Sequence, residues 1–153
     1  MKRLFLFLLL SSLAFGDGDY YLATYSQALV ASTDALTIQM PAGATKSVRG
    51  VVAWVRCSAA CTFTVSQNGT PATTTTLATI AMNGSIGSQV KAYSASNVGS
   101  GTTQGTYYLE SAGTYPIDLT KYLLVRGTNS NITISIATFT GTWVPTIQWG
   151  ENP

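Results

Sequence analysis

Apolar and polar residues alternate along most of this chain with the two-residue period of β-strands. The clearest alternation covers 131–140, where isoleucines at positions 132, 134 and 136 are separated by small or hydroxyl-bearing residues. Shorter segments of the same kind are found at 20–25, 35–40, 47–57, 61–67, 74–82, 89–96, 106–110 and 142–149. Gly, Pro and Asn residues separate them, as is typical of turns. The pattern predicts eight or nine short strands and almost no amphipathic helix.

Many short strands with regular turn spacing are typical of an all-β domain. We therefore expect an antiparallel β-sandwich, of jelly-roll or immunoglobulin-like type, formed by residues 17–153 as a single domain. The segment 142–149 carries Trp143, Pro145 and Trp149 on one side. Because proline cannot donate a hydrogen bond to a neighbouring strand, this segment is expected at a sheet edge or at a bulge.

A secretory signal peptide is predicted at residues 1–16. A basic pair precedes an apolar run at 4–10, and Ala14 and Gly16 supply the small residues of a cleavage site. The run is shorter than the roughly 20 residues that a membrane-spanning helix needs. We expect cleavage after Gly16, no membrane span, and a mature protein that is secreted or held at the cell surface.

Charge limits the partners of the mature chain. Charged residues make up 9% of the sequence, against roughly 25% in an ordinary soluble protein. The formal net charge is +2. Cleavage would remove Lys2 and Arg3 from the eight basic residues, which leaves six against six acidic residues. A neutral chain offers no basic patch to nucleic acid and has little self-repulsion, so we expect a homo-oligomer and no nucleic-acid partner.

Catalytic and metal-binding groups are scarce in this sequence. It contains no histidine, which removes Ser-His-Asp and Cys-His triads and histidine metal sites. Among the six acidic residues, only Asp17 and Asp19 lie close together in the sequence. Two carboxylates fall short of the roughly six to eight oxygen ligands that calcium prefers. We therefore predict no enzyme activity, no catalytic residue, no metal and no cofactor.

Cys57 and Cys61 are the only cysteines, and export would place them in an oxidising compartment where a disulfide is expected. Residues four apart in a strand lie about 13 Å from each other, whereas a disulfide needs Cα atoms within about 7 Å. The chain must therefore turn between the two cysteines. We predict a β-hairpin whose strands pair directly across this turn, with Arg56 opposite Thr62. This register places Ala53, Val55, Cys57, Cys61, Phe63 and Val65 on one apolar face and Trp54, Arg56, Thr62 and Thr64 on the other.

Aromatic side chains supply the candidate binding groups. The hairpin register puts Trp54 beside Arg56 on the face opposite the cysteines, where it is either covered by a second layer or exposed to a partner. The candidate ligand or partner contacts are Trp54, Arg56, Trp143, Trp149, Tyr20 and Tyr21. The leading hypothesis is a secreted, non-enzymatic structural or adhesive subunit that self-associates into an extracellular assembly. The alternative is a carbohydrate-binding module that stacks sugars on surface aromatics.

The N-terminal segment 17–34 is expected to form an extension or a strand. It carries aromatic residues at positions 20, 21 and 25. A strand at a free terminus can pair within its own sheet, which is the usual outcome, or with the open edge of a neighbouring copy. The sequence leaves both arrangements open.

Overall fold

The computed structural model describes residues 19–152 except 72–73, 83–86, 96–97, 100, 123 and 125–129. The predicted signal peptide thus lies outside the described residues. The strands are β1 (Asp19–Thr24), β2 (Gln27–Gln39), β3 (Ser47–Cys57), β4 (Cys61–Gln67), β5 (Thr70–Pro71), β6 (Thr74–Leu77), β7 (Ile80–Ala81), β8 (Lys91–Ala95), β9 (Val98–Gly99), β10 (Thr102–Leu109), β11 (Gly113–Asp118) and β12 (Asn131–Asn152). All their pairings are antiparallel. The all-β class and the antiparallel pairing are confirmed.

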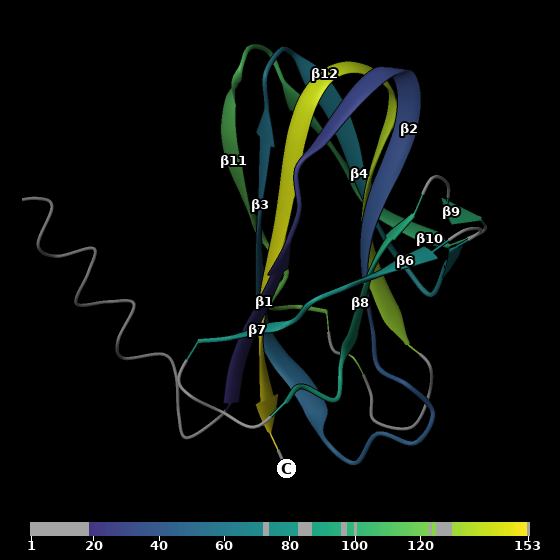
Figure 1. Ribbon diagram of the computed structural model, residues 1–153, viewed down its shortest axis with the longest axis vertical. Helices are drawn as coiled ribbons and strands as arrows, with labels where there is room; N and C mark the ends of the chain where they lie inside the picture. Colours follow the sequence, from purple (N-terminus) through teal and green to yellow (C-terminus); the bar gives the residue numbers. More distant parts are fainter. Residues whose placement is uncertain are drawn as a thin grey trace, which may run out of the picture.

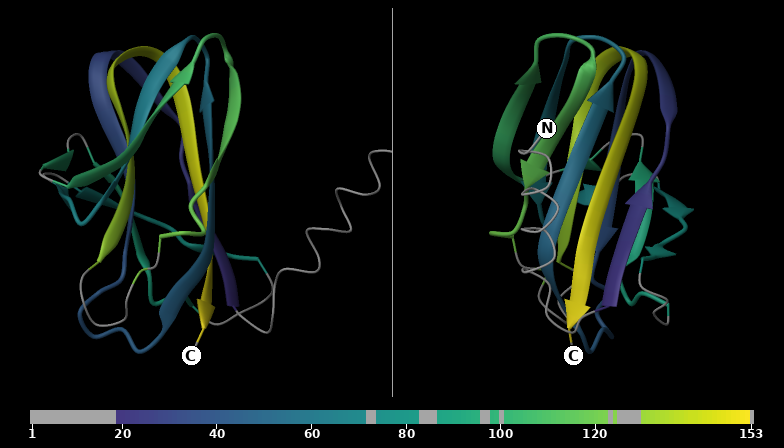
Figure 2. Two further views of the ribbon diagram at one scale, coloured as in Figure 1. Left: turned by 180° about the vertical axis from the view of Figure 1, so that it is seen from behind. Right: turned by 90° about the vertical axis from the view of Figure 1, so that its left-hand side faces the viewer.

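Ten of these strands form one sheet that curls into a half-barrel, and β5 and β9 form a separate pair (Figure 1). Four stretches of chain lie side by side and turn over at the same end: β1 with β2, β12 alone, β3 with β4, and β11 with β10 (Figure 2). We call this the turnover end. Each stretch runs along one half of the sheet, turns over, and returns along the other half. The two halves therefore consist largely of the same four stretches and face each other across the core. The strands are more numerous than the eight or nine expected, and two are much longer.

The turnover of β2 and β12 has a local cause. Ala31 and Thr138 have φ values of 46° and 49°, and Gly141 has a φ of 137°. The register between β12 and β2 shifts on both sides of Phe139. Such bulges bend a strand and increase its twist. The Ala31 N–H donates to Thr140 Oγ1 at 3.0 Å, so the two bends are joined.

One strand of 22 residues, β12, replaces the two strands predicted at 131–140 and 142–149. Its second part lies between β3 and β1, so the expectation of a sheet edge at Pro145 is wrong. The Pro145 carbonyl accepts a hydrogen bond from Thr24 Oγ1 at 3.1 Å. The Pro145 nitrogen lies on the same side of β12 as its carbonyl. On that side it faces the connection between the end of β1 and the start of β2, where no strand is present to pair with it. The missing N–H therefore breaks no ladder hydrogen bond.

The predicted turn and disulfide are present: Cys57 and Cys61 are bonded, with Cα atoms 6.6 Å apart. The predicted inward face is also confirmed, because the six residues assigned to it are at most 8% exposed. The direct pairing across the turn is wrong. Arg56 lies opposite Thr114 of β11 and Val144 of β12 rather than opposite Thr62. The strands β3 and β4 instead belong to different halves of the sheet. The disulfide links them at the turnover end, where the chain passes from one half to the other.

Replacing Cys57 with serine is expected to destabilise the protein by about 1 to 3 kcal/mol. The effect is at the low end for a disulfide because the closed loop is short. Denaturant unfolding of the wild type and the variant measures it. A reductant should lower the stability of the wild type toward that of the variant and leave the variant unchanged; a wild type indifferent to reductant would contradict the prediction.

The N-terminal strand belongs to its own sheet. β1 pairs with β12 along its whole length and with β7 on its other side. Its inward residue Tyr21 stacks on Trp149 with ring centroids 6.1 Å apart. Both side chains are at most 1% exposed. The segment therefore completes the core of its own chain, which is the usual of the two outcomes considered.

Candidate functional site

The structure divides the six candidate contact residues into two groups. Trp143, Trp149 and Tyr21 are at most 1% exposed and belong to the core. Their rings are therefore not available to a surface ligand, which corrects the expectation for these three. The other three are Tyr20 and Trp54, which are half-buried, and Arg56, which is exposed. These three share one surface, because they alternate with buried neighbours on β1 and β3.

We name this surface the Trp54 face. It is the outer side of β7, β1, β12, β3 and β11. The strands β1, β12, β3 and β11 are seen side by side in the right-hand view of Figure 2. The central row of this face runs from Thr24 through Thr146 and Trp54 to Pro116, and the next row from Ile80 through Leu22, Gln148 and Val52 to Asp118. None of these side chains is buried. The rows contain a single charged residue, Asp118, so this surface is broad and mostly uncharged.

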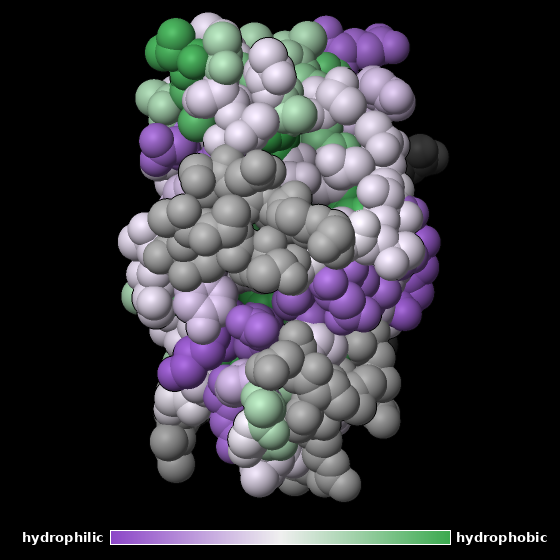
Figure 3. Space-filling model, turned by 90° about the vertical axis from the view of Figure 1, so that its right-hand side faces the viewer, coloured by the Kyte–Doolittle hydropathy of each residue, from purple (hydrophilic) through white to green (hydrophobic). Residues whose placement is uncertain are grey.

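The opposite side of the molecule has a different character (Figure 3). It carries hydrophilic residues across its middle, and hydrophobic residues gather near the turnover end. At that end, Val30 of β2 is 84% exposed.

A hollow of about 620 Å³ lies where the Trp54 face meets the turnover end. Arg56, Ser26, Ser58 and Thr142 are among its lining residues. The Ser58 N–H donates to the Thr142 carbonyl and the Thr142 N–H donates to Ser58 Oγ, each at 2.9 Å. The size falls within the range of small-molecule sites. Hydroxyls and a guanidinium are groups suited to a ligand rich in oxygen.

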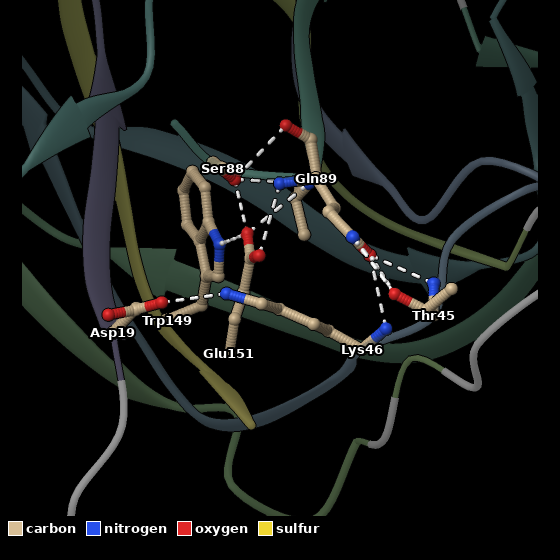
Figure 4. A network of polar contacts seen from close by, with 8 residues as sticks. Asp19, Thr45, Lys46, Ser88, Gln89, Trp149 and Glu151 are labelled. Carbon is tan, nitrogen blue, oxygen red and sulfur yellow. Dashed lines mark hydrogen bonds and ion pairs between the residues drawn. The ribbon is translucent and has the colours of Figure 1, made fainter. Parts of the chain in front are cut away.

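A buried carboxylate organises the other end of the molecule (Figure 4). Glu151 is 1% exposed. It accepts hydrogen bonds from the Ser88 hydroxyl, from the N–H of Gln89 at 3.0 Å and of Val90 at 3.3 Å, and from Trp149 Nε1 at 3.2 Å. The carboxylate thus fastens the segment before β8 to the end of β12.

The same contacts continue into the turn before β3 (Figure 4). Gln89 Oε1 accepts from the backbone N–H of Thr45 at 2.9 Å and of Lys46 at 3.0 Å. The Lys46 ammonium pairs with Asp19 at 2.7 Å. That hydrogen bond raises the pKa of Lys46. These groups hold three chain segments together.

A second buried carboxylate, Asp34, lies near the turnover end and is 8% exposed. Its Oδ2 accepts from the Tyr25 hydroxyl at 2.5 Å and from Trp143 Nε1 at 2.7 Å. The hydroxyl comes from the chain between β1 and β2, so the carboxylate joins this connection to β12.

The two carboxylates are too far apart to act as a pair. Asp34 reaches the indole of Trp143 and Glu151 reaches that of Trp149. Six residues of strand separate these indoles, which corresponds to about 20 Å. A glycosidase needs two carboxyl groups within about 10 Å. Within the part of the chain that the structure describes, no group of three or more His, Cys, Asp or Glu residues could hold a metal ion.

Replacing Tyr25 with phenylalanine is expected to cost about 1 to 2 kcal/mol at pH 7, because Asp34 loses a buried donor. Burial, followed by the hydrogen bond and the charge of Asp34, raises the pKa of Tyr25 far above its ordinary 10.0. The unfolded chain ionises near pH 10 while the folded chain keeps the proton. The stability from this group is therefore complete below pH 10 and is lost as the pH rises further.

Denaturant unfolding between pH 7 and 11 tests this prediction. The wild type should lose stability above pH 10 more steeply than the Tyr25→Phe variant. Parallel pH profiles for the two proteins would contradict it, since the remaining tyrosines are common to both.

Sequence reasoning missed both buried carboxylates. Both residues lie just outside the strands expected from the sequence, at 35–40 and 142–149, where an acidic residue is ordinarily solvated. No local signal marks Asp34 or Glu151 as an acceptor for distant donors. The burial of Trp143 and Trp149 did have a signal, because both share their parity with Ile147 and Pro145 in one strand.

No family description, no curated protein and no solved structure matches this chain. In the described residues we find no helix with the length and apolar character required to cross a membrane.

Proposed function

We propose that the chain is a secreted, non-enzymatic structural or adhesive subunit that works by surface contact and associates with its own copies. In this proposal it is a β-sandwich in which the two halves of the curled sheet serve as the layers. The observation that carries the proposal is the Trp54 face, a broad and mostly uncharged sheet surface without a covering layer among the described residues. A disulfide-bonded cysteine pair is consistent with the extracellular location.

The chemistry of the Trp54 face favours contact with another surface. Partly exposed Trp, Tyr and aliphatic side chains with few charged neighbours are typical of the centre of protein interfaces. Trp54 lies between Pro116 and Thr146 of the two neighbouring strands, at the centre of its row. The buried carboxylates Asp34 and Glu151 are occupied by hydrogen bonds within the fold, which supports a non-enzymatic role.

Replacing Trp54 with alanine is expected to weaken binding to the partner surface by at least about tenfold, as for an aromatic residue central to an interface. Adhesion of the labelled protein to producing cells measures the effect. Val30→Ala is the matched control, because Val30 is exposed but lies outside the Trp54 face. Equal behaviour of the two variants, both folded by circular dichroism, would overturn the proposal for this face.

Carbohydrate binding is the second candidate, and the hollow beside Arg56 favours it. The guanidinium and hydroxyls that line this hollow are suited to the hydroxyl groups of a sugar. Retention of the protein on insoluble polysaccharides would test this function. Loss of retention in both Trp54→Ala and Arg56→Ala, with unchanged self-association, would favour a carbohydrate-binding module over a structural subunit.

A further inference from the structure

The strand β10 forms an open edge of the main sheet. It pairs with β4 on one side, and no described strand pairs with its other side. Its sequence, TTQGTYYL, contains neither a charged residue nor proline. Half of its backbone N–H and C=O groups therefore face outward in a row that can accept another strand.

The strands β6, β7 and β11, which also lie at edges of the described sheet, are guarded. β6 has four residues and β7 has two, so neither offers a long row of backbone groups. β11 contains Pro116, which lacks a backbone donor, and ends at the charged Asp118. Short strands, prolines and charges are the usual protections against pairing between molecules. Among these four edge strands, β10 alone has none of these protections, and its pairing with β4 shifts register between Thr103 and Gly105.

Side chains of the core remain partly uncovered along this same edge. Tyr107 of β10 stacks on Phe63 with centroids 5.4 Å apart and lies 5.8 Å from Tyr115 of β11. Tyr107, Tyr115 and Leu109 pack against the core but are only half-buried. The green hairpin of β10 and β11 lies at the side of the curled sheet, where its two strands do not pair with each other (Figure 2). A strand added to β10 would satisfy the backbone groups and cover these apolar side chains.

We propose that β10 pairs antiparallel with β10 of a second copy, about a two-fold axis near Thr106. The proposal rests on the self-association in the proposed function and names the surface responsible. A two-fold axis lets the same edge supply both partners. Because β10 carries no charge, no like charges meet across the axis. The exposed Tyr108 of each copy, at 71%, gains a cross-strand neighbour.

Lysine at the centre of this edge tests the proposal. We expect the wild-type mature chain to dimerise in size-exclusion chromatography with light scattering. Thr106→Lys should raise the dimer dissociation constant by at least about tenfold, because two like charges then meet across the axis. Thr76→Lys is the matched control: it adds the same charge to an exposed threonine of the guarded edge strand β6 and should leave the dimer unchanged.

Charge complementation makes the test specific to pairing between the β10 edges. Thr106→Glu alone should also be monomeric, and an equimolar mixture with Thr106→Lys should recover the dimer. A mixture that stays monomeric, or equal effects of Thr106→Lys and Thr76→Lys, would overturn the proposal. Assembly that persists in a folded Thr106→Lys variant would overturn this inference alone. A wild type that stays monomeric at every concentration would overturn it together with the self-association in the proposed function.

Discussion

Replacing Glu151 with alanine is expected to destabilise the protein by about 3 to 5 kcal/mol. The carboxylate is 1% exposed and accepts hydrogen bonds from Ser88, Gln89, Val90 and Trp149. Each buried donor that loses its acceptor costs about 1 to 3 kcal/mol, although water entering the site would recover part of this. The free energy of unfolding from denaturant titration measures the loss.

The expected loss has a local signature. The amide protons of Gln89 and Val90 donate to the carboxylate, so their hydrogen exchange should accelerate more than that of β12. Glu110→Ala is the matched control, because Glu110 is exposed in the connection between β10 and β11 and should change stability by no more than about 0.5 kcal/mol. If Glu151→Ala were as stable as this control, the anchoring role of the carboxylate would be wrong.

The faces of the strands could be predicted from the sequence, but their partners could not. Alternation assigned Val55 and Phe63 to the buried side correctly, because the side-chain period of a strand is a local property. It did not show that β12 would pair with both β3 and β4. Pairing depends on contacts between residues far apart in the chain, and the same alternation is compatible with many partners.

The candidate site was predictable to a similar extent. The position of Trp54 on an outer face followed from its alternation with Val55 and Cys57, which face inward, and was correct. The apolar row that continues the surface, through Leu22 of β1 and Ile80 of β7, depends on pairings that no local pattern specifies. The open edge of β10 is a property of the whole sheet order and could not be deduced from the segment itself.

Replacing Gly141 with alanine is expected to destabilise the protein by about 2 to 4 kcal/mol. Gly141 has a φ of 137°, which side chains disfavour. A Cβ atom would also lie 2.6 Å from Ser58 Oγ and 3.0 Å from the Phe139 ring. Strained backbone costs about 1 to 3 kcal/mol and overpacking costs a similar amount. Gly113→Ala is the control, because a Cβ there would meet nothing within 4 Å.

A double-mutant cycle separates the two causes of this loss. Ser58→Ala removes the hydroxyl that the new Cβ would meet, and on its own it frees the Thr142 N–H from its acceptor. If the steric contact dominates, Gly141→Ala should cost less in the Ser58→Ala background by about 1 kcal/mol or more. If backbone strain dominates, the two losses should add. A Gly141→Ala protein as stable as Gly113→Ala would contradict the prediction. The bend of β12 would then accommodate a side chain at this position without strain and without loss of packing.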